Sequence, residues 1–226
     1  MRLLAPRAGA AAEFAAAGRP DAGAPWRQAG WCALDLELTG LHPRKDEIIA
    51  IGAVPIEQGR VLLGQSLYTL VRTTKRSDPN AVIVHKLRVA DLADAPSLEE
   101  AIDGLLRLLA GRVPVFHTAH VERNFLRPLF TRRRLRLPAA ADTEVLGRRW
   151  LRERTGETRS WLPLGELAEQ LHQPAEIPHH ALGDALTTAK AFIALASLLD
   201  AGSAQTVGSL LSASDPRAAA AARRFG

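Results

Sequence analysis

Three extended segments follow one another near the start of the chain, and this succession limits the fold more than any other feature. They are rich in apolar residues and cover Trp31–Glu37, Glu47–Ile56 and Arg60–Val71. Short links separate them, and Gln58 and Gly59 form a predicted turn between the second and the third. Because consecutive strands with short links pair with each other, we expect an antiparallel meander.

The rest of the chain alternates between helical and extended patterns. Ser97 caps a helix that ends at Leu109, and Glu100 completes its capping box. The other expected elements are a strand at Val113–Phe116, a helix at Ala119–Arg134, a short extended segment at Leu137–Asp142, and helices at Thr143–Arg152, Leu164–Leu171 and Ala181–Leu199. Three strands followed by such an alternation predict an α/β domain with a mixed sheet.

The composition indicates a globular domain with segments of different composition at its two ends. The chain has 47% hydrophobic and 23% charged residues, which are globular values and exclude intrinsic disorder of the whole. Its ends are rich in Ala and Arg, so we expect helical or disordered segments at 1–28 and 203–226 around a domain at 29–202. Cys32 is the single cysteine, which excludes an intramolecular disulfide and fits a reducing, cytoplasmic location. No run of about 18 apolar residues is present, so we expect no membrane span.

Basic residues are unevenly distributed. The chain carries 29 Lys and Arg against 24 Asp and Glu, a net charge of +5. The segment Arg123–Arg159 alone contains eleven arginines and four acids, a net charge of +7. Clustered arginines suit a polyanionic partner, because the guanidinium group pairs bidentately with phosphate. A general bias of the sequence toward Arg and Ala is the alternative explanation.

Two carboxylates lie in the first expected strand, where acidic residues are uncommon. Asp35 and Glu37 are two positions apart, so their side chains point to the same face, with leucines on the other. Adjacent like charges raise each other's pKa, and a divalent metal with oxygen ligands would remove the conflict. Solvated acids on an exposed edge strand are the alternative. The segment Thr39–Leu41 fits a tight turn after a central strand and favours a site.

Two further polar motifs stand at element boundaries. His179 precedes the helix at Ala181–Leu199, and Asp184 lies in its first turn. The histidine is a candidate general base, whereas a surface histidine and a helix-capping carboxylate are the plainer alternatives. His117 follows a strand, and Glu122 lies on the next helix, where it is either a site carboxylate or a solvated one.

Taken together, these three segments resemble the DEDDh 3′–5′ exonucleases, the DnaQ-like family of the proofreading ε subunit of bacterial DNA polymerase III. The family's first motif, Asp-x-Glu-Thr-Thr-Gly, corresponds to Asp35–Gly40. The second, roughly His-Asn-Ala-x-Phe-Asp-x-x-Phe-Leu, corresponds to His117–Leu126, and the third, His-x-Ala-x-x-Asp, to His179–Asp184. Their order and spacing agree with the family over about residues 31–200.

The resemblance implies a ribonuclease H-like α/β fold, with a five-stranded mixed sheet and helices on both faces. It implies two Mg²⁺ or Mn²⁺ ions held by four catalytic carboxylates: Asp35, Glu37, Glu122 and Asp184. His179 is the implied general base. Residues beside these groups are expected to contact the substrate strand: Leu38, Thr39, Gly40, His117 and Thr118.

The resemblance also implies the reaction and the partners. We expect metal-dependent hydrolysis from a 3′ end that releases nucleoside 5′-monophosphates, with DNA favoured over RNA and a role in proofreading or repair. The expected partners are a nucleic acid with a free 3′ end and a DNA polymerase subunit. An exonuclease of RNA or short oligoribonucleotides is one alternative, and a catalytically weakened nucleic-acid-binding or polymerase-associated module is another.

The sequence departs from the family pattern at four positions, mostly around one carboxylate. Glu122 stands where the family has Asp, which keeps the charge and adds a methylene. Thr118 replaces the usual Asn, Val121 the usual Phe, and Leu38 the first Thr of the first motif. Mg²⁺ tolerates displaced ligands poorly, so full activity, slowed activity and binding alone all remain open at this point.

Overall fold

A mixed sheet forms the centre of the computed structural model, which describes residues 9–214. Its strands are β1 (Gly30–Leu38), β2 (Ile48–Glu57), β3 (Arg60–Val61), β4 (Leu67–Leu70), β5 (Arg112–Phe116) and β6 (Ala141–Asp142). The order is β3-β2-β1-β5-β6, and β4 also pairs with β2. The pairs of β2 with β1, β3 and β4 are antiparallel, whereas β1 with β5 and β5 with β6 are parallel. The expected antiparallel meander is therefore confirmed.

The sheet has six strands instead of the expected five, because the third predicted strand is divided. A 3-10 turn at Leu63–Gln65 separates β3 from β4, and its central residue is a glycine, which weakens a strand. Gln58 and Gly59 have φ angles of 52° and 71°, as a two-residue hairpin turn with both residues left-handed requires. The extended segment expected at Leu137–Asp142 is reduced to β6, since Pro138 cannot donate to a strand ladder.

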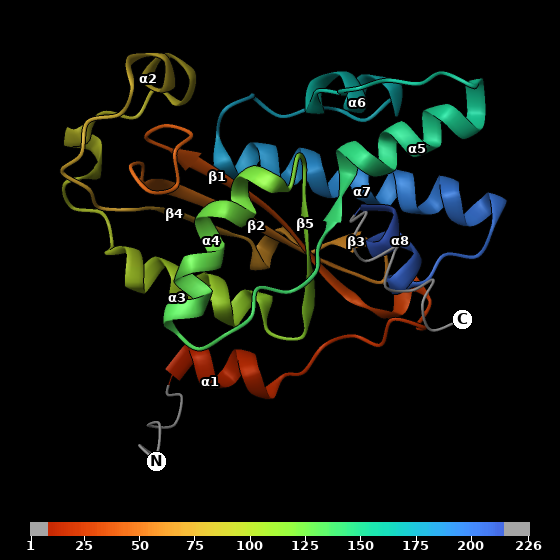
Figure 1. Ribbon diagram of the computed structural model, residues 1–226, viewed down its shortest axis with the longest axis horizontal. Helices are drawn as coiled ribbons and strands as arrows, with labels where there is room; N and C mark the ends of the chain where they lie inside the picture. Colours follow the sequence, from red (N-terminus) through yellow and green to blue (C-terminus); the bar gives the residue numbers. More distant parts are fainter. Residues whose placement is uncertain (1–8, 215–226) are drawn as a thin grey trace.

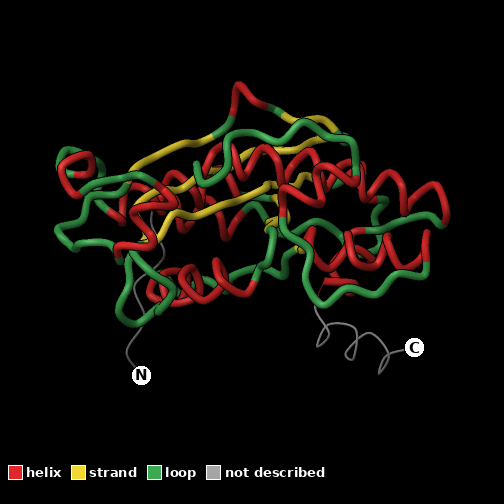
Figure 2. Tube along the Cα trace, turned by 90° about the horizontal axis from the view of Figure 1, so that it is seen from above, coloured by secondary structure: helices red, strands yellow, loops and turns green. Residues whose placement is uncertain are grey.

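The helices lie on both sides of this sheet (Figure 1). They are α1 (Gly9–Ala16), α2 (Pro79–His85), α3 (Leu98–Leu109), α4 (His120–Arg132), α5 (Thr143–Thr155), α6 (Leu164–Gln170), α7 (Ala181–Gly202) and α8 (Val207–Ser214). In Figure 2 the strands run side by side with helices packed against them. The Ser97–Glu100 capping box of α3 is present as predicted.

Alternate side chains of β1 divide the interior into two hydrophobic clusters. Trp31 and Ala33 belong to the cluster that contains the buried face of α7, where the Phe192 ring lies 4.6 Å from that of Trp31. Cys32 and Leu34 belong to the cluster that contains α3 and α4. Each face of the central strand is thus covered by helices, which is the α/β layering that the sequence predicted.

The long helix α7 has the length and the mean hydropathy, 1.4, of a membrane-crossing segment. Half of the apolar stretch of α7 is buried in the protein. Its residues Ala185, Ala189 and Phe192 pack into the hydrophobic cluster beneath β1 and β2. Its apolar composition is therefore explained by its position in the core.

The Ala-rich ends contribute to both clusters. In α1, Ala10 is 1% exposed and the Phe14 ring packs edge-on against Phe130, 5.6 Å away. Near the other end, Val207 and Leu210 of α8 are buried against α5 and the sheet. The expected domain limits at residues 29 and 202 stay a prediction, and the outermost parts of both segments, 1–8 and 215–226, lie outside the described residues.

Candidate active site

Asp35 and Glu37 continue the alternation of side chains along β1 that also places Trp31 and Ala33 in the core. Trp31 and Ala33 face α7, and Asp35 and Glu37 follow on the same face toward the end of the strand. Asp35 is partly exposed, whereas Glu37 is 8% exposed. On this face of β1, apolar core residues are therefore followed by two carboxylates toward the end of the strand.

A glycine in β2 lets the start of α7 approach these two carboxylates. Gly52 pairs with Asp35 on one side and with Tyr68 of β4 on the other. A Cβ atom at Gly52 would overlap the backbone carbonyl of Ala181, the first residue of α7. Because Gly52 has no side chain, the start of α7 packs directly against the backbone of β2. This contact places Asp184 close to Asp35 of β1.

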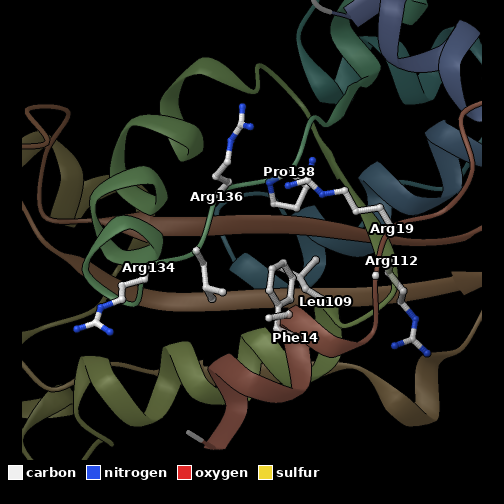
Figure 3. Close-up of a pocket in the computed structure, with 10 residues that line it drawn as sticks. Phe14, Arg19, Leu109, Arg112, Arg134, Arg136 and Pro138 are labelled. Carbon is white, nitrogen blue, oxygen red and sulfur yellow. The ribbon is translucent and has the colours of Figure 1, made fainter. Parts of the chain in front are cut away.

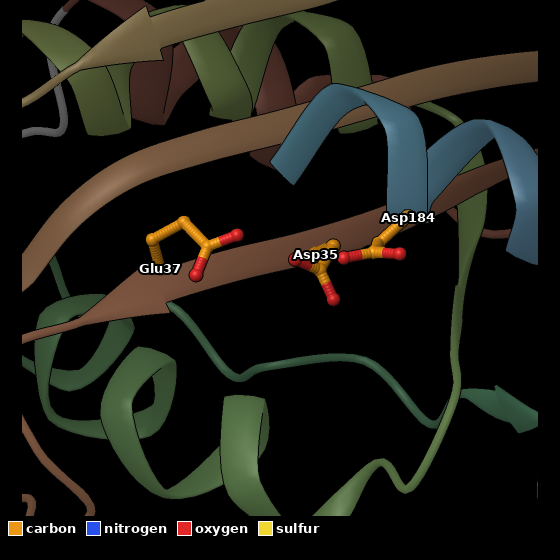
Figure 4. A group of neighbouring side chains, drawn as sticks. All are labelled: Asp35, Glu37 and Asp184. Carbon is orange, nitrogen blue, oxygen red and sulfur yellow. The ribbon is translucent and has the colours of Figure 1, made fainter. Parts of the chain in front are cut away.

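Three carboxylates come together where α7 begins above β1. The ligand oxygens of Asp35, Glu37 and Asp184 lie within 4.8 Å of one another. Figure 4 shows the Asp184 side chain reaching from α7 beside Asp35, with Glu37 farther along β1. The sequence placed two of these on one strand face and the third on a helix start, and the fold brings all three to one point.

The two adjacent histidines before α7 have different positions. The backbone N–H of His179 donates to Asp184 Oδ2 at 2.7 Å, the residue has a left-handed φ of 63°, and its side chain is exposed. His180 is the N-cap of α7: its Nδ1 accepts from Gly183 N at 3.3 Å, and its ring stacks on Tyr68 at 4.6 Å. His180 is thereby held by two contacts, whereas the side chain of His179 is exposed and its backbone is anchored to Asp184.

The fourth expected carboxylate approaches from α4. Glu122 lies in the first turn of that helix, is 8% exposed, and has a buried Oε2 with no hydrogen-bond partner among the described residues. It is outside the group of three carboxylates, but its charge is the largest electrostatic contribution to the raised pKa of Asp35. Glu122 therefore lies near Asp35, although it is not part of the group of three carboxylates.

Asp142 fixes the approach of α4 and was not predicted as a site residue. At the end of β6 it accepts hydrogen bonds from Thr118 N at 3.1 Å and Ala119 N at 2.9 Å. It also caps α5 by accepting from Glu144 N at 3.0 Å. One buried carboxylate thus ties the turn before α4 to the start of α5, a role that only the pairing of β5 with β6 reveals.

Burial raises the pKa of all four carboxyl groups, and repulsion within the cluster adds to this effect at Asp35 and Glu37. Desolvation, followed by the charges of Glu122, Asp184 and Glu37, raises the pKa of Asp35 well above its usual value. Desolvation and the Asp184 charge raise the pKa of Glu37 to about 7, and desolvation raises that of Glu122 to about 8. Desolvation also raises the pKa of Asp184, against the opposing effect of the hydrogen bond from His179 N.

This donor set fits divalent cations. All four groups offer carboxylate oxygen, the ligand type that Mg²⁺ and Mn²⁺ prefer. Glu37 Oε1 and Glu122 Oε2 are buried without a hydrogen-bond partner among the described residues. Cations held by these carboxylates would satisfy both atoms and relieve the repulsion that contributes to the raised pKa values of Asp35 and Glu37.

The five expected substrate contacts occupy two sides of the cluster. Leu38 and Gly40 line a groove of 680 Å³ beside Glu37, whereas the buried Thr39 hydroxyl accepts from Glu47 N at 3.0 Å and supports the turn after β1. On the other side, His117 Nδ1 lies 2.9 Å from Thr143 Oγ1, and Thr118 has a left-handed φ of 63°. Their contacts with substrate stay a prediction.

The groove beside Glu37 also contains residues that the sequence did not place in the site. Its lining includes Val121 of α4 and His85 of α2. His85 is buried, its Nε2 lacks a partner among the described residues, and burial lowers its pKa. The helix α2 was not predicted, because its seven residues are too few for a periodic pattern.

Four of the eleven arginines in this segment form ion pairs with described acids, and Arg148 with Glu144 is one of these pairs. Arg133 pairs with Glu99 and Asp103, Arg149 with Glu153, and Arg159 with Glu157 and Glu166. The other arginines of this segment leave binding of a polyanion as a prediction.

A separate cavity lies under α1, away from the carboxylates. Its volume is 270 Å³, and it is lined by Phe14, Leu109, Pro138 and several arginines. In Figure 3 the side chains of Arg134 and Arg136 extend outward from it. It shares no residue with the groove beside Glu37.

Comparison with known proteins gives a consistent result. The family model RNase_T, described as exonuclease, matches residues 32–192. The "DNA polymerase III subunit epsilon-like protein" of Rhodobacter capsulatus is 33% identical over 180 residues, which cover 78% of this chain and 25% of that protein. The "3'-5' exonuclease DinG" of Staphylococcus epidermidis is 28% identical over 165 residues, which cover 73% of this chain and 18% of that protein. The chain thus spans a quarter or less of the length of these two relatives.

Solved structures share the fold at low sequence identity. Exonuclease X in complex with 5′ overhanging duplex DNA matches with a TM-score of 0.63 and 20% identity, over 82% of this chain and 99% of that one. The nuclease domain of 3′hExo, a DEDDh family member bound to rAMP, matches with a TM-score of 0.58 and 16% identity, over 81% and 98%. These likenesses concern the fold.

Proposed function

This chain belongs to the RNase_T exonuclease family, and on that premise we propose that it is a metal-dependent 3′–5′ exonuclease acting on DNA ends. The product would be a nucleoside 5′-monophosphate released from the 3′ terminus. The observation that carries the proposal is the convergence of Asp35, Glu37 and Asp184 within 4.8 Å, with buried Glu122 facing them.

The four carboxylates are the proposed ligands of two Mg²⁺ or Mn²⁺ ions. Asp35, Glu37 and Asp184 would hold one ion, while Asp35 and Glu122 would hold the other. Such ions supply Lewis-acid stabilisation of the charge that develops at phosphorus and lower the pKa of the attacking water. Their removal would leave four mutually repelling, partly desolvated acids and no means of charge stabilisation.

His179 is the proposed general base. Its backbone N–H donates to Asp184, so the residue lies next to a site carboxylate, and its side chain is exposed. An imidazole there would take the proton of the attacking water through one of its ring nitrogens. His180 cannot exchange roles with it without giving up the cap of α7 and the stack on Tyr68.

DNA is the proposed substrate, and a DNA polymerase subunit is a proposed partner in proofreading or repair. The names of the curated relatives support both, since they include an epsilon-like protein and "DNA polymerase III PolC-type" of Thermotoga petrophila, the latter 28% identical over 177 residues that cover 77% of this chain and 12% of that protein. A cytoplasmic location is proposed on the single, free Cys32.

A catalytically weak nucleic-acid-binding module is the second candidate. One observation favours it: Glu122, the residue that replaces the family's Asp, lies outside the close group of three carboxylates. A second ion held poorly there would leave binding intact while slowing the reaction.

The test compares 5′-labelled and 3′-labelled DNA and RNA oligonucleotides with Mg²⁺, Mn²⁺ or excess EDTA. We expect a ladder from the 5′-labelled DNA, immediate release of the 3′ label as mononucleotide, and no product in EDTA. Asp35→Asn should abolish cleavage, because it removes the carboxylate shared by both ions. Undiminished cleavage in EDTA would contradict the metal mechanism, and faster cleavage of RNA would overturn the substrate assignment.

A further inference from the structure

The groove beside Glu37 continues into a second hollow along α4. This hollow has a volume of 730 Å³ and shares His42 and Lys45 with the first. Its lining consists of the loop after β1 and one side of α4: His42, Pro43, Arg44, Lys45, Asn124, Pro128 and Arg132. We call this second hollow the basic groove.

One stripe of α4 joins the two hollows. Val121 lines the first, and Asn124, Pro128 and Arg132 line the basic groove at intervals of three and four residues. Such spacing keeps side chains on one side of a helix. From Val121 to Arg132 the helix rises about 16 Å, so the stripe leads away from the carboxylates for the length of about five stacked nucleotides.

The basic groove carries positive charge that no described acid neutralises. Arg44, Lys45 and Arg132 are exposed, and none forms an ion pair with the described residues. No acidic residue lines the groove. Asp46, which lines the neighbouring hollow, is already paired with Lys75 at 2.9 Å. These three cations differ in this respect from Arg133, which is engaged by Glu99 and Asp103.

We infer that the basic groove holds the sugar–phosphate backbone of a single DNA strand whose 3′ end lies at the carboxylates. The inference rests on the proposed function and names its substrate class: single-stranded 3′ ends of about five nucleotides or more. Arg44, Lys45 and Arg132 bind phosphates, which positions the strand without reading its sequence. The groove contains no Phe, Tyr or Trp among its lining residues, so it lacks a stacking platform that would favour particular bases.

Length and salt dependence are the measurable consequences. Affinity should rise with strand length up to about five nucleotides and then level off, because further phosphates lie beyond the stripe of α4. Each phosphate neutralised on a single strand contributes about −0.7 to the slope of log affinity against log salt. Replacing two cations should therefore make that slope shallower by about 1.4.

The experiment compares two double variants that remove the same charge. Arg44→Gln with Arg132→Gln changes the basic groove, and Arg19→Gln with Arg136→Gln changes the exposed rim of the cavity under α1. Binding of 5′-fluorescent single-stranded DNA of about three and about twelve nucleotides is followed by anisotropy across a salt series, in an Asp35→Asn background that prevents cleavage. KM and kcat are measured for the same strands in the parent background.

We expect the groove variant to flatten the salt slope by about 1.4 for the longer strand and to raise its KM more than that of the shorter one. The rim variant should bind and cleave like the parent. An unchanged slope in the groove variant, or equal flattening in both variants, would overturn the inference.

The two proposals fail in different ways. A parent protein that shortens no DNA from its 3′ end would contradict the proposed function, while the anisotropy series would still report whether the basic groove binds strands. A parent that does shorten DNA, together with a groove variant that behaves like the rim variant, would contradict the groove alone.

Discussion

Glu122 is the expected ligand that lies outside the close group of three carboxylates, and its substitutions test the second ion site. Glu122→Gln should lower the rate with Mg²⁺, because an amide keeps the shape but has no charge to hold a cation. Glu122→Asp should preserve or raise the Mg²⁺ rate, since it restores the shorter ligand of the family pattern. The parent should be faster with Mn²⁺ than with Mg²⁺, which demands the more ideal octahedron.

Steady-state rates of the three proteins with each metal check this prediction. Glu169→Gln, which changes an exposed acid on α6, is the matched control and should behave like the parent. If Glu122→Gln equals the parent with both metals, then Glu122 is not a ligand, and its buried, unpartnered oxygen has another cause.

The two histidines before α7 should separate chemistry from stability. His179→Ala should lower kcat by about 10²- to 10⁴-fold, the usual size of general-base catalysis, with little change in unfolding. His180→Ala should cost about 0.5–2 kcal/mol of stability, because it removes the N-cap of α7 and the stack on Tyr68. Paired kcat and urea-unfolding measurements decide between them, and a larger kcat loss in His180→Ala would reverse the assignment.

The residues of the site were predictable to different degrees. Asp35 and Glu37 followed from the two-residue period of a strand, and Asp184 from its place in the first turn of an amphipathic helix. Gly52 and Asp142 were not predicted as site residues, because their roles depend on where α7 and β6 meet the rest of the fold. Gly52 did carry a signal, since a glycine inside an apolar strand indicates close approach of another backbone.

Among the elements, the contact between β2 and the start of α7 positions the site most directly. Gly52→Ala would place a Cβ against the Ala181 carbonyl and push the helix start, with His179 and Asp184, away from β1. Overpacking of this kind costs about 1–3 kcal/mol or more. A displacement of about 1 Å at the reacting groups would also lower kcat/KM by about 10²-fold.

A matched substitution elsewhere controls for the added methyl group. Gly165 lies in α6, where an added Cβ atom would meet no neighbouring side chain or strand within 4 Å. Gly165→Ala should therefore leave activity unchanged. As a helix position it should gain about 0.5–1 kcal/mol in urea unfolding. Normal activity in Gly52→Ala would mean that α7 can shift without moving Asp184 away from Asp35. The close contact between Gly52 and Ala181 would then not determine the geometry of the site.

The elements themselves were predicted well where a long periodic pattern existed. The amphipathic α3 and the apolar β1 and β2 appear within a residue or two of their expected bounds. The single predicted strand at Arg60–Val71 is two strands, because apolar alternation alone does not show that Gly64 interrupts the ladder. The short α2 had no pattern to find.

For the whole molecule, the family membership confirms the resemblance seen in the three motifs. The ribonuclease H-like α/β class is likewise confirmed by the solved structures that share the fold. The basic character of Arg123–Arg159 stays a prediction of a polyanion-binding surface. Four of its eleven arginines form ion pairs with described acids, and Arg149–Glu153 is an example. Sequence clustering could not reveal these pairings, which depend on side-chain positions in the folded state.

The four site carboxyls also make global stability depend on pH and metal. In the metal-free protein, burial raises the pKa of Glu37 from 4.5 to about 7 and that of Glu122 from 4.5 to about 8. A carboxyl group with a raised folded-state pKa contributes stability that is fully present below its unfolded value and is lost as pH rises through the folded value. The free energy of unfolding should therefore fall between about pH 5 and about pH 9.

Divalent ions should reverse this loss, because they bind the deprotonated carboxylates of the folded state and raise its stability by mass action. In urea unfolding, Mg²⁺ or Mn²⁺ should stabilise the parent strongly at about pH 9 and little at about pH 5. The double variant Glu37→Gln with Glu122→Gln should show a flatter pH dependence and a weaker metal effect, whereas the exposed-acid control Glu169→Gln should match the parent. A parent whose stability does not change with metal at high pH would show that these carboxylates form no ion site, independently of any measurement of nuclease activity.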